Sequence, residues 1–66
     1  MEEYQQRVIE EKIQLDEKLL RLHNFLSSDK LKDLDLDDQN LLVEQEHAMK
    51  IYSIILWNRI NRFGVK

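Results

Sequence analysis

The sequence contains no cysteine, no proline and only one glycine among its 66 residues. Without cysteine the chain forms no disulfide, and cysteine-based zinc sites are excluded. Proline and glycine are the residues that most often interrupt helices, and the chain contains almost none of them. Charged residues make up 35% of the chain and hydrophobic residues 42%, which is typical of long helices rather than of sheets or disordered segments. We expect an all-α protein.

The sequence lacks the residues that several classes of protein function require. The only histidines, His23 and His47, fall on different predicted helices without further ligands, which argues against a metal site. No nucleophile–base pair, glycine-rich phosphate loop or paired-carboxylate motif is present, so we assign no catalytic residue, no cofactor and no enzymatic activity. A net charge of -3 disfavours a nucleic-acid polymer as a partner. No membrane-spanning run or signal peptide is recognisable, so we expect a cytoplasmic protein.

The apolar residues predict two helices. Residues 2–26 and 38–63 carry them at helical spacing, whereas the connection, 27–37, is rich in Ser and Asp, which favour turns and helix caps. Asp37 is the expected N-cap of the second helix, and Gly64 the left-handed residue after its end. The pattern predicts one domain of 66 residues, an antiparallel two-helix hairpin with a short helical turn in the connection.

Each predicted helix has a main apolar stripe. On the first helix it consists of Tyr4, Val8, Leu15, Leu19, Leu22 and Leu26. On the second helix it consists of Leu41, Leu42, Gln45, Ala48, Met49, Tyr52, Ile55, Leu56, Arg59, Ile60 and Phe63. Folding the hairpin pairs positions whose numbers sum to about 67, so the two stripes face each other along their length.

Further apolar residues lie outside these stripes and would be exposed in a lone hairpin. Because a chain of this size buries only a small core, association with other copies is the simplest way to cover them. The sequence therefore predicts a homo-oligomer in which several hairpins form a helical bundle. Its expected interface residues are Ile9, Ile13, Leu20, Ile51, Ile54 and Trp57.

Gln45, Tyr52 and Arg59 recur every seven residues within the predicted stripe of the second helix. Polar groups at such positions need partners. In one interpretation they form a binding track, with an amide contact from Gln45, stacking or a hydroxyl bond from Tyr52, and an anionic group held by Arg59. In the other they pair with neighbouring acids or backbone groups and specify the register of the hairpin, as buried polar residues do in coiled coils.

Aromatic and guanidinium side chains gather at the predicted open end of the hairpin. Bases stack on aromatic rings and arginine forks onto phosphate, so this mixture suits a nucleotide. The alternative is that the rings finish the core while the arginines are solvated. The candidate ligand-binding residues are Tyr4, Arg7, Tyr52, Arg59 and Arg62.

Apolar, aromatic and charged residues follow one another along both predicted helices in a particular order: Tyr4, Arg7, Val8, Glu11, Leu15, Lys18, Leu22, Phe25 and Leu26, then Leu41, Leu42, Gln45, Met49, Tyr52, Leu56, Arg59 and Ile60. This order resembles that of a family, the small two-helix proteins of phages and prophages named after a crAss-like phage. The resemblance covers nearly the whole chain.

In size and hairpin architecture such proteins look like the oligomeric sponge proteins with which phages sequester cyclic nucleotide signals of bacterial immunity. The resemblance implies a non-enzymatic anti-defence protein that acts in the host cell cytoplasm and binds a cyclic nucleotide. The alternative function is a helical interaction module that binds and inhibits a host protein through the surface around Trp57.

Overall fold

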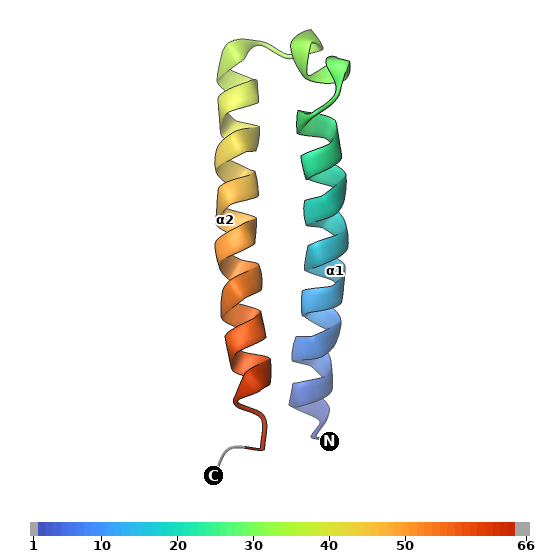
Figure 1. The fold of residues 1–66 in the computed structure, drawn as a ribbon, viewed down its shortest axis with the longest axis vertical. Helices are drawn as coiled ribbons and strands as arrows, with labels where there is room; N and C mark the ends of the chain where they lie inside the picture. Colours follow the sequence, from blue (N-terminus) through green and yellow to red (C-terminus); the bar gives the residue numbers. More distant parts are fainter. Residues whose placement is uncertain (1, 65–66) are drawn as a thin grey trace.

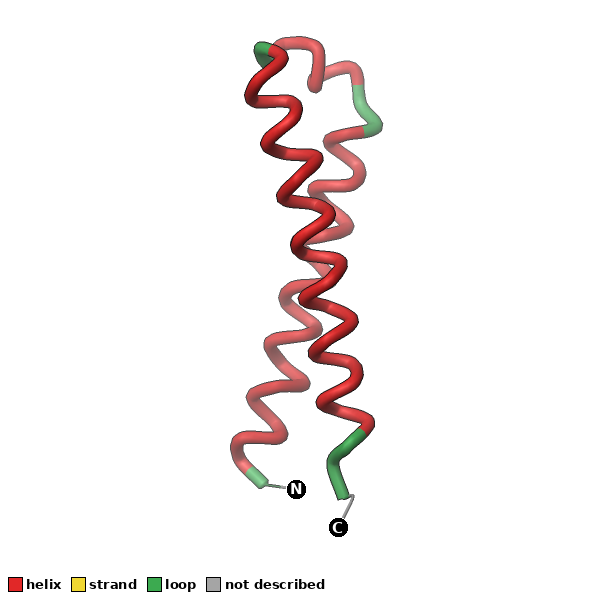
Figure 2. Tube along the Cα trace, turned by 90° about the vertical axis from the view of Figure 1, so that its left-hand side faces the viewer, coloured by secondary structure: helices red, strands yellow, loops and turns green. Residues whose placement is uncertain are grey.

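Two long helices side by side make up the structure, a computed structural model that describes residues 2–64 (Figure 1). Helix α1 spans Glu3–Leu26, the short 3-10 helix η1 spans Asp29–Asp33, and α2 spans Leu36–Asn61. The start of α1 and the end of α2 lie opposite η1, and the side view shows the two long helices crossing each other (Figure 2). The predicted all-α hairpin with a helical turn in its connection is therefore confirmed.

Capping fixes where α2 begins. The carboxylate of Asp35 accepts a hydrogen bond from the backbone N–H of Asp38 at 2.9 Å, so Asp35 is the N-cap. The expected N-cap, Asp37, is wrong by two residues. Neighbouring aspartates offer the same capping chemistry, which is why the sequence does not distinguish them. The side-chain amide of Gln39 donates to the backbone carbonyl of Leu34 at 2.8 Å and so ties the first turn of α2 to the connection.

The far end of α2 shows the expected glycine conformation. Gly64 has a φ of 84°, the left-handed conformation that follows many helices and that glycine adopts without steric cost. The helix itself ends at Asn61, and the amide N–H groups of Arg62 and Phe63 bond back to carbonyls of its last turn at 3.1 and 3.0 Å.

The two helices meet along a seam in which steps of three and four residues alternate. This is the spacing that keeps one face of each helix against the other. On α1 the seam consists of the buried or half-buried residues Gln5, Val8, Lys12, Leu15, Leu19, Leu22 and Leu26. On α2 and the turn that follows it, the seam consists of Gln39, Leu42, Glu46, Met49, Ser53, Leu56, Ile60 and Phe63. Leu56 is fully buried, so the tightest packing lies toward the open end.

The stripe predicted for α1 is confirmed except at its first residue. Its five leucine and valine positions all lie in the seam. Tyr4 is 57% exposed, although its ring packs edge-on against Phe63 with centroids 6.0 Å apart. That contact agrees with the expected antiparallel pairing.

The stripe predicted for α2 is confirmed at Leu42, Met49, Leu56, Ile60 and Phe63, which lie in the seam, and is wrong at its other positions. Gln45, Tyr52 and Arg59 are exposed, and their neighbours Glu46 and Ser53 lie in the seam instead. The physical reason is that α2 carries apolar residues on nearly every side, so apolar spacing alone does not select its inner face. Yet neither of the long helices in the described chain is apolar enough over sufficient length to cross a membrane.

The seam predicts which leucines matter for stability. We expect Leu56→Ala to lower the free energy of unfolding by about 2–5 kcal/mol, because the truncation leaves a cavity in the core. The matched control is Leu36→Ala, because the Leu36 side chain is 69% exposed. This substitution should change the free energy of unfolding by only about 0.5 kcal/mol. Urea denaturation followed by circular dichroism measures both; equal effects would contradict this seam.

Candidate functional site

The seam divides the surface of the hairpin into two broad sides. Heptad spacing places residues of α1 and α2 that flank the seam on one side or the other. The lysine–tryptophan side comprises Ile9, Ile13, Asp16, Leu20 and His23 of α1 with Val43, Lys50, Ile54 and Trp57 of α2. The tyrosine–arginine side comprises Tyr4, Arg7 and Glu11 of α1 with Leu41, Gln45, Tyr52, Ile55, Arg59 and Arg62 of α2.

A closed polar network lies at the middle of the seam. The ammonium of Lys12 donates to Asp16 Oδ2 at 2.6 Å and to Ser53 Oγ at 3.0 Å, and the Ser53 hydroxyl donates to Asp16 Oδ1 at 2.6 Å. Ser53 is buried, and the side chain of Lys12 is only 19% exposed. Because each polar group finds partners within the network, the burial of a charge here is compensated.

The network holds Asp16 in its ionised form. The hydrogen bond from Lys12 lowers the pKa of Asp16 below its ordinary value of 3.8, and the hydrogen bond from Ser53 lowers it further, while burial opposes both. The ammonium of Lys12 also stands 5.9 Å from the centroid of the Trp57 ring, within the range of a cation–π contact. The network thus continues onto the lysine–tryptophan side.

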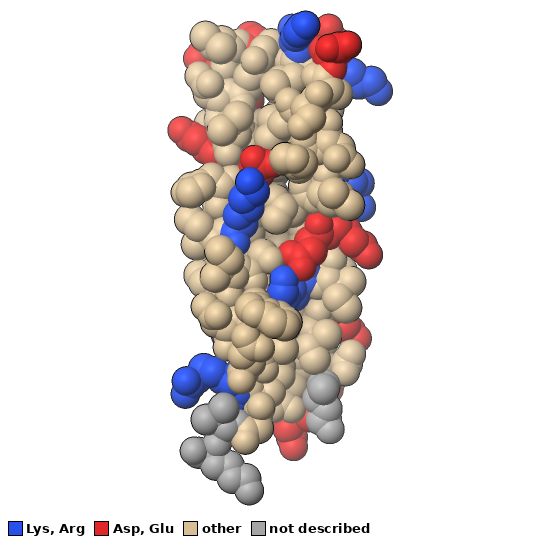
Figure 3. All heavy atoms as spheres, viewed as in Figure 1, with Lys and Arg blue, Asp and Glu red and all other residues tan. Residues whose placement is uncertain are grey.

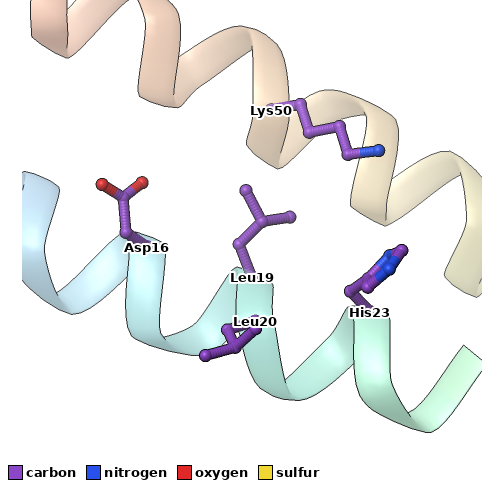
Figure 4. A pocket seen from close by; sticks show the side chains of 5 residues that line it. All are labelled: Asp16, Leu19, Leu20, His23 and Lys50. Atoms are coloured by element: carbon purple, nitrogen blue, oxygen red, sulfur yellow. The ribbon is translucent and has the colours of Figure 1, made fainter.

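A hollow of about 380 Å³ opens on the same side, next to the network. Asp16, Leu19 and His23 point from α1 toward α2, and Lys50 extends from α2 toward His23 (Figure 4). Leu20 completes the lining. Figure 3 shows a broad, mostly uncharged face on which acidic and basic atoms meet between the helices.

Glu46 joins the two basic groups at this hollow. Its carboxylate lies 2.9 Å from His23 Nδ1 and 3.5 Å from the ammonium of Lys50. The hydrogen bond with His23 lowers the pKa of Glu46 below its ordinary value of 4.5, and Lys50 adds to this effect by its charge. The acids beside the hollow are therefore each matched by a base.

The structure brings the candidate ligand-binding residues to one side but into different surroundings. Tyr4 and Tyr52 are exposed, and the Tyr52 hydroxyl donates to the Glu11 carboxylate. Arg7 pairs with Glu3 at 2.9 Å on the surface. The other two candidates are the exposed arginines Arg59 and Arg62, and neither belongs to an ion pair formed within residues 2–64.

The candidate interface residues also gather, with one exception. Ile13, Leu20, Ile54 and Trp57 are exposed on the lysine–tryptophan side, where Ile9 is half-buried. The exception is Ile51, which is exposed on the outer back of α2.

Sequence reasoning missed the network and the role of Glu46. The sequence analysis assigned no role to Lys12 or Asp16, since a lysine and an acid four residues apart are common on helix surfaces. The available signal was heptad position: Lys12 occupies the same column as Leu19, and Ser53 the same column as Ile60. Within the described chain no three His, Asp or Glu side chains lie close enough together to hold a metal ion.

Comparison with known proteins matches residues 2–62 to the family model described as Sequestin. This range contains α1, η1 and α2 in full. No curated protein and no solved structure matches the chain. The family name indicates a protein that sequesters a partner, which is a binding role rather than a catalytic one.

The network predicts an acid-sensitive contribution to stability. We expect Asp16→Asn to lower the free energy of unfolding by about 1 kcal/mol at pH 7, since the carboxylate is 44% exposed and partly screened. Because the pKa of Asp16 is lower in the folded protein than in the unfolded chain, ionised Asp16 stabilises the fold above pH 3.8. This stabilisation is lost as the pH falls through the lowered pKa.

The deficit of Asp16→Asn should therefore shrink below pH 3.8. Urea titrations at pH 7, 5 and 3 measure it, and Glu17→Gln, which alters an exposed neighbouring acid, is the control. If the difference in unfolding free energy between wild type and Asp16→Asn stays constant with pH, the pairing of Asp16 with Lys12 is refuted.

Proposed function

We propose that this chain, which belongs to the Sequestin family, binds a small anionic nucleotide of the cyclic kind used in immune signalling and withholds it without chemical change. The family match over both helices carries the first half of this proposal, the sequestering role. The tyrosine–arginine side supports the second half, the nature of the ligand.

The open end of that side offers groups suited to a nucleotide. Arg59 and Arg62 are exposed and are not engaged in the ion pairs among residues 2–64, so their guanidinium groups are available for phosphate. Tyr4 and Tyr52 present partly exposed rings on which a base can stack. The hydrogen bond from Tyr52 to Glu11 orients one of these rings in advance.

Self-association is the second part of the proposal. Exposed large apolar side chains occur on both flanks and on the back of α2, and a two-helix chain has little core of its own. Covering them by further copies gives a helical bundle with several equivalent binding sites. The resemblance to small phage proteins supports the proposal that such an oligomer acts against bacterial defence in the host cytoplasm.

A second candidate function is inhibition of a host protein through direct contact. The observation favouring it is the exposure of Trp57 and Ile54 on one side of α2, since aromatic residues often anchor protein interfaces. In that case the protein would bind a macromolecule and show no affinity for nucleotides.

Titration calorimetry with a panel of cyclic di- and trinucleotides tests the proposed function. We expect one or more members to bind, and heating the complex should release the ligand with its mass and chromatographic mobility unchanged. Absence of binding throughout the panel would favour the second candidate, and a modified ligand would show that the protein is an enzyme.

Arg59 provides the sharpest test of the ligand-binding residues. If its guanidinium forks onto phosphate, Arg59→Lys should weaken binding despite the retained charge. Arg59→Ala should cost more, about 1.5–3 kcal/mol of binding free energy, as expected for hydrogen bonds to a charged group. Since Arg59 is exposed, neither variant should change the melting temperature of the protein. Unchanged affinity in both variants would exclude Arg59 from the site.

The mass in solution tests self-association separately. Light scattering at micromolar concentration should give at least twice the 8.1 kDa of one chain. A charged residue at position 54, as in Ile54→Glu, should reduce the mass because a buried unpaired charge is strongly unfavourable. A wild-type mass of 8.1 kDa would contradict the oligomer.

A further inference from the structure

The hollow on the lysine–tryptophan side and the exposed indole of Trp57 are complementary features of one surface. We propose that two copies associate antiparallel through this side about a two-fold axis, so that Trp57 of each copy fills the hollow of the other. This assignment rests on the self-association proposed above and adds the surface, the symmetry and the anchoring residue.

The charges around the hollow favour a protein side chain over an anionic ligand. Asp16 is neutralised by Lys12, and Glu46 lies beside both His23 and Lys50, so no excess of positive charge faces the opening. Leu19 and Leu20 give the hollow an apolar lining. An apolar hollow with balanced charges at its edge suits an aromatic side chain that brings little charge of its own.

The spacing of the features along the hairpin makes the surface complementary to itself. Trp57 and Lys50 are seven residues apart on α2, about 10 Å along the axis, and the network at Asp16 and Ser53 lies between their levels. A two-fold axis across the hairpin at the network exchanges those two levels. Trp57 of one copy then lies at Lys50 of the second, over the hollow.

The same axis brings apolar residues of α1 together. Ile13 lies between Lys12 and Asp16, the network residues of α1, so it lies close to the axis and faces its own counterpart, whereas Leu20 of one copy comes opposite Ile9 of the second. Ile54, one residue from Ser53, lies close to the axis and meets its own counterpart. The indole that enters the hollow gains burial and a cation–π contact with Lys50. One symmetric contact thereby covers the exposed apolar residues of this side.

The absence of cysteine makes disulfide cross-linking a clean test. We would prepare Ile9→Cys and Leu20→Cys, verify their helicity, and oxidise each alone and in an equimolar mixture with oxidised glutathione. A disulfide requires Cα atoms about 4.4–6.8 Å apart. In the proposed dimer position 9 meets position 20, whereas like positions are separated by about 15 Å or more along α1.

We expect the covalent dimer to form mainly in the mixture, at least fivefold faster than in either variant alone. Ile54→Cys should cross-link with itself, and Ile51→Cys, on the back of α2, is the matched control that should not. Equal rates for the single variants and the mixture would overturn the antiparallel arrangement, and an oligomeric wild type without these cross-links would overturn the surface while leaving self-association intact.

The fluorescence of Trp57, the single tryptophan, gives an independent readout. Its emission should shift to shorter wavelength as the protein is concentrated through the association range, and Leu20→Glu should abolish the shift. Emission that is independent of concentration in a protein that associates by light scattering would refute the insertion of Trp57. Nucleotide binding is measured separately, so its failure would not be mistaken for failure of this interface.

Discussion

Lys12, Asp16 and Ser53 satisfy one another in the middle of the seam, and this network determines how α2 is turned against α1. An ammonium group that is largely buried is tolerated only with close polar partners. Both partners here lie within 3.0 Å, one on each helix. Turning α2 by one residue would bring Tyr52 inward and remove the serine hydroxyl, leaving Lys12 and Asp16 without their contact to the second helix.

The two sides of the hairpin follow from that orientation. With Ser53 inward, Trp57 and Lys50 flank the seam on one side, while Tyr52 and Arg59 flank it on the other. A surface with a hollow and paired charges is thereby separated from a surface with tyrosine rings and arginines. The separation allows one side to join copies while the other remains open to a ligand, which is the arrangement that the proposed sequestering role requires.

The sequence predicted the helices well and the inner face of α2 poorly. The first helix is amphipathic, so Leu15, Leu19 and Leu22 identified its buried stripe. In α2, apolar residues such as Leu41 and Ile55 compete with Leu56 for the inner position, and spacing alone cannot rank them. The decision depends on pairing between positions 41 residues apart, such as Lys12 and Ser53, which no local pattern encodes.

The orientation of α2 is tested most directly by proton–proton contacts in nuclear magnetic resonance. We expect nuclear Overhauser effects between the β-protons of Ser53 and those of Asp16, whose side chains are joined by a hydrogen bond of 2.6 Å. In contrast, the ring of Tyr52 should show contacts with Glu11. If the Tyr52 ring contacts the methyl groups of Leu15 and Ser53 shows no contact with Asp16, this orientation of α2 against α1 is contradicted.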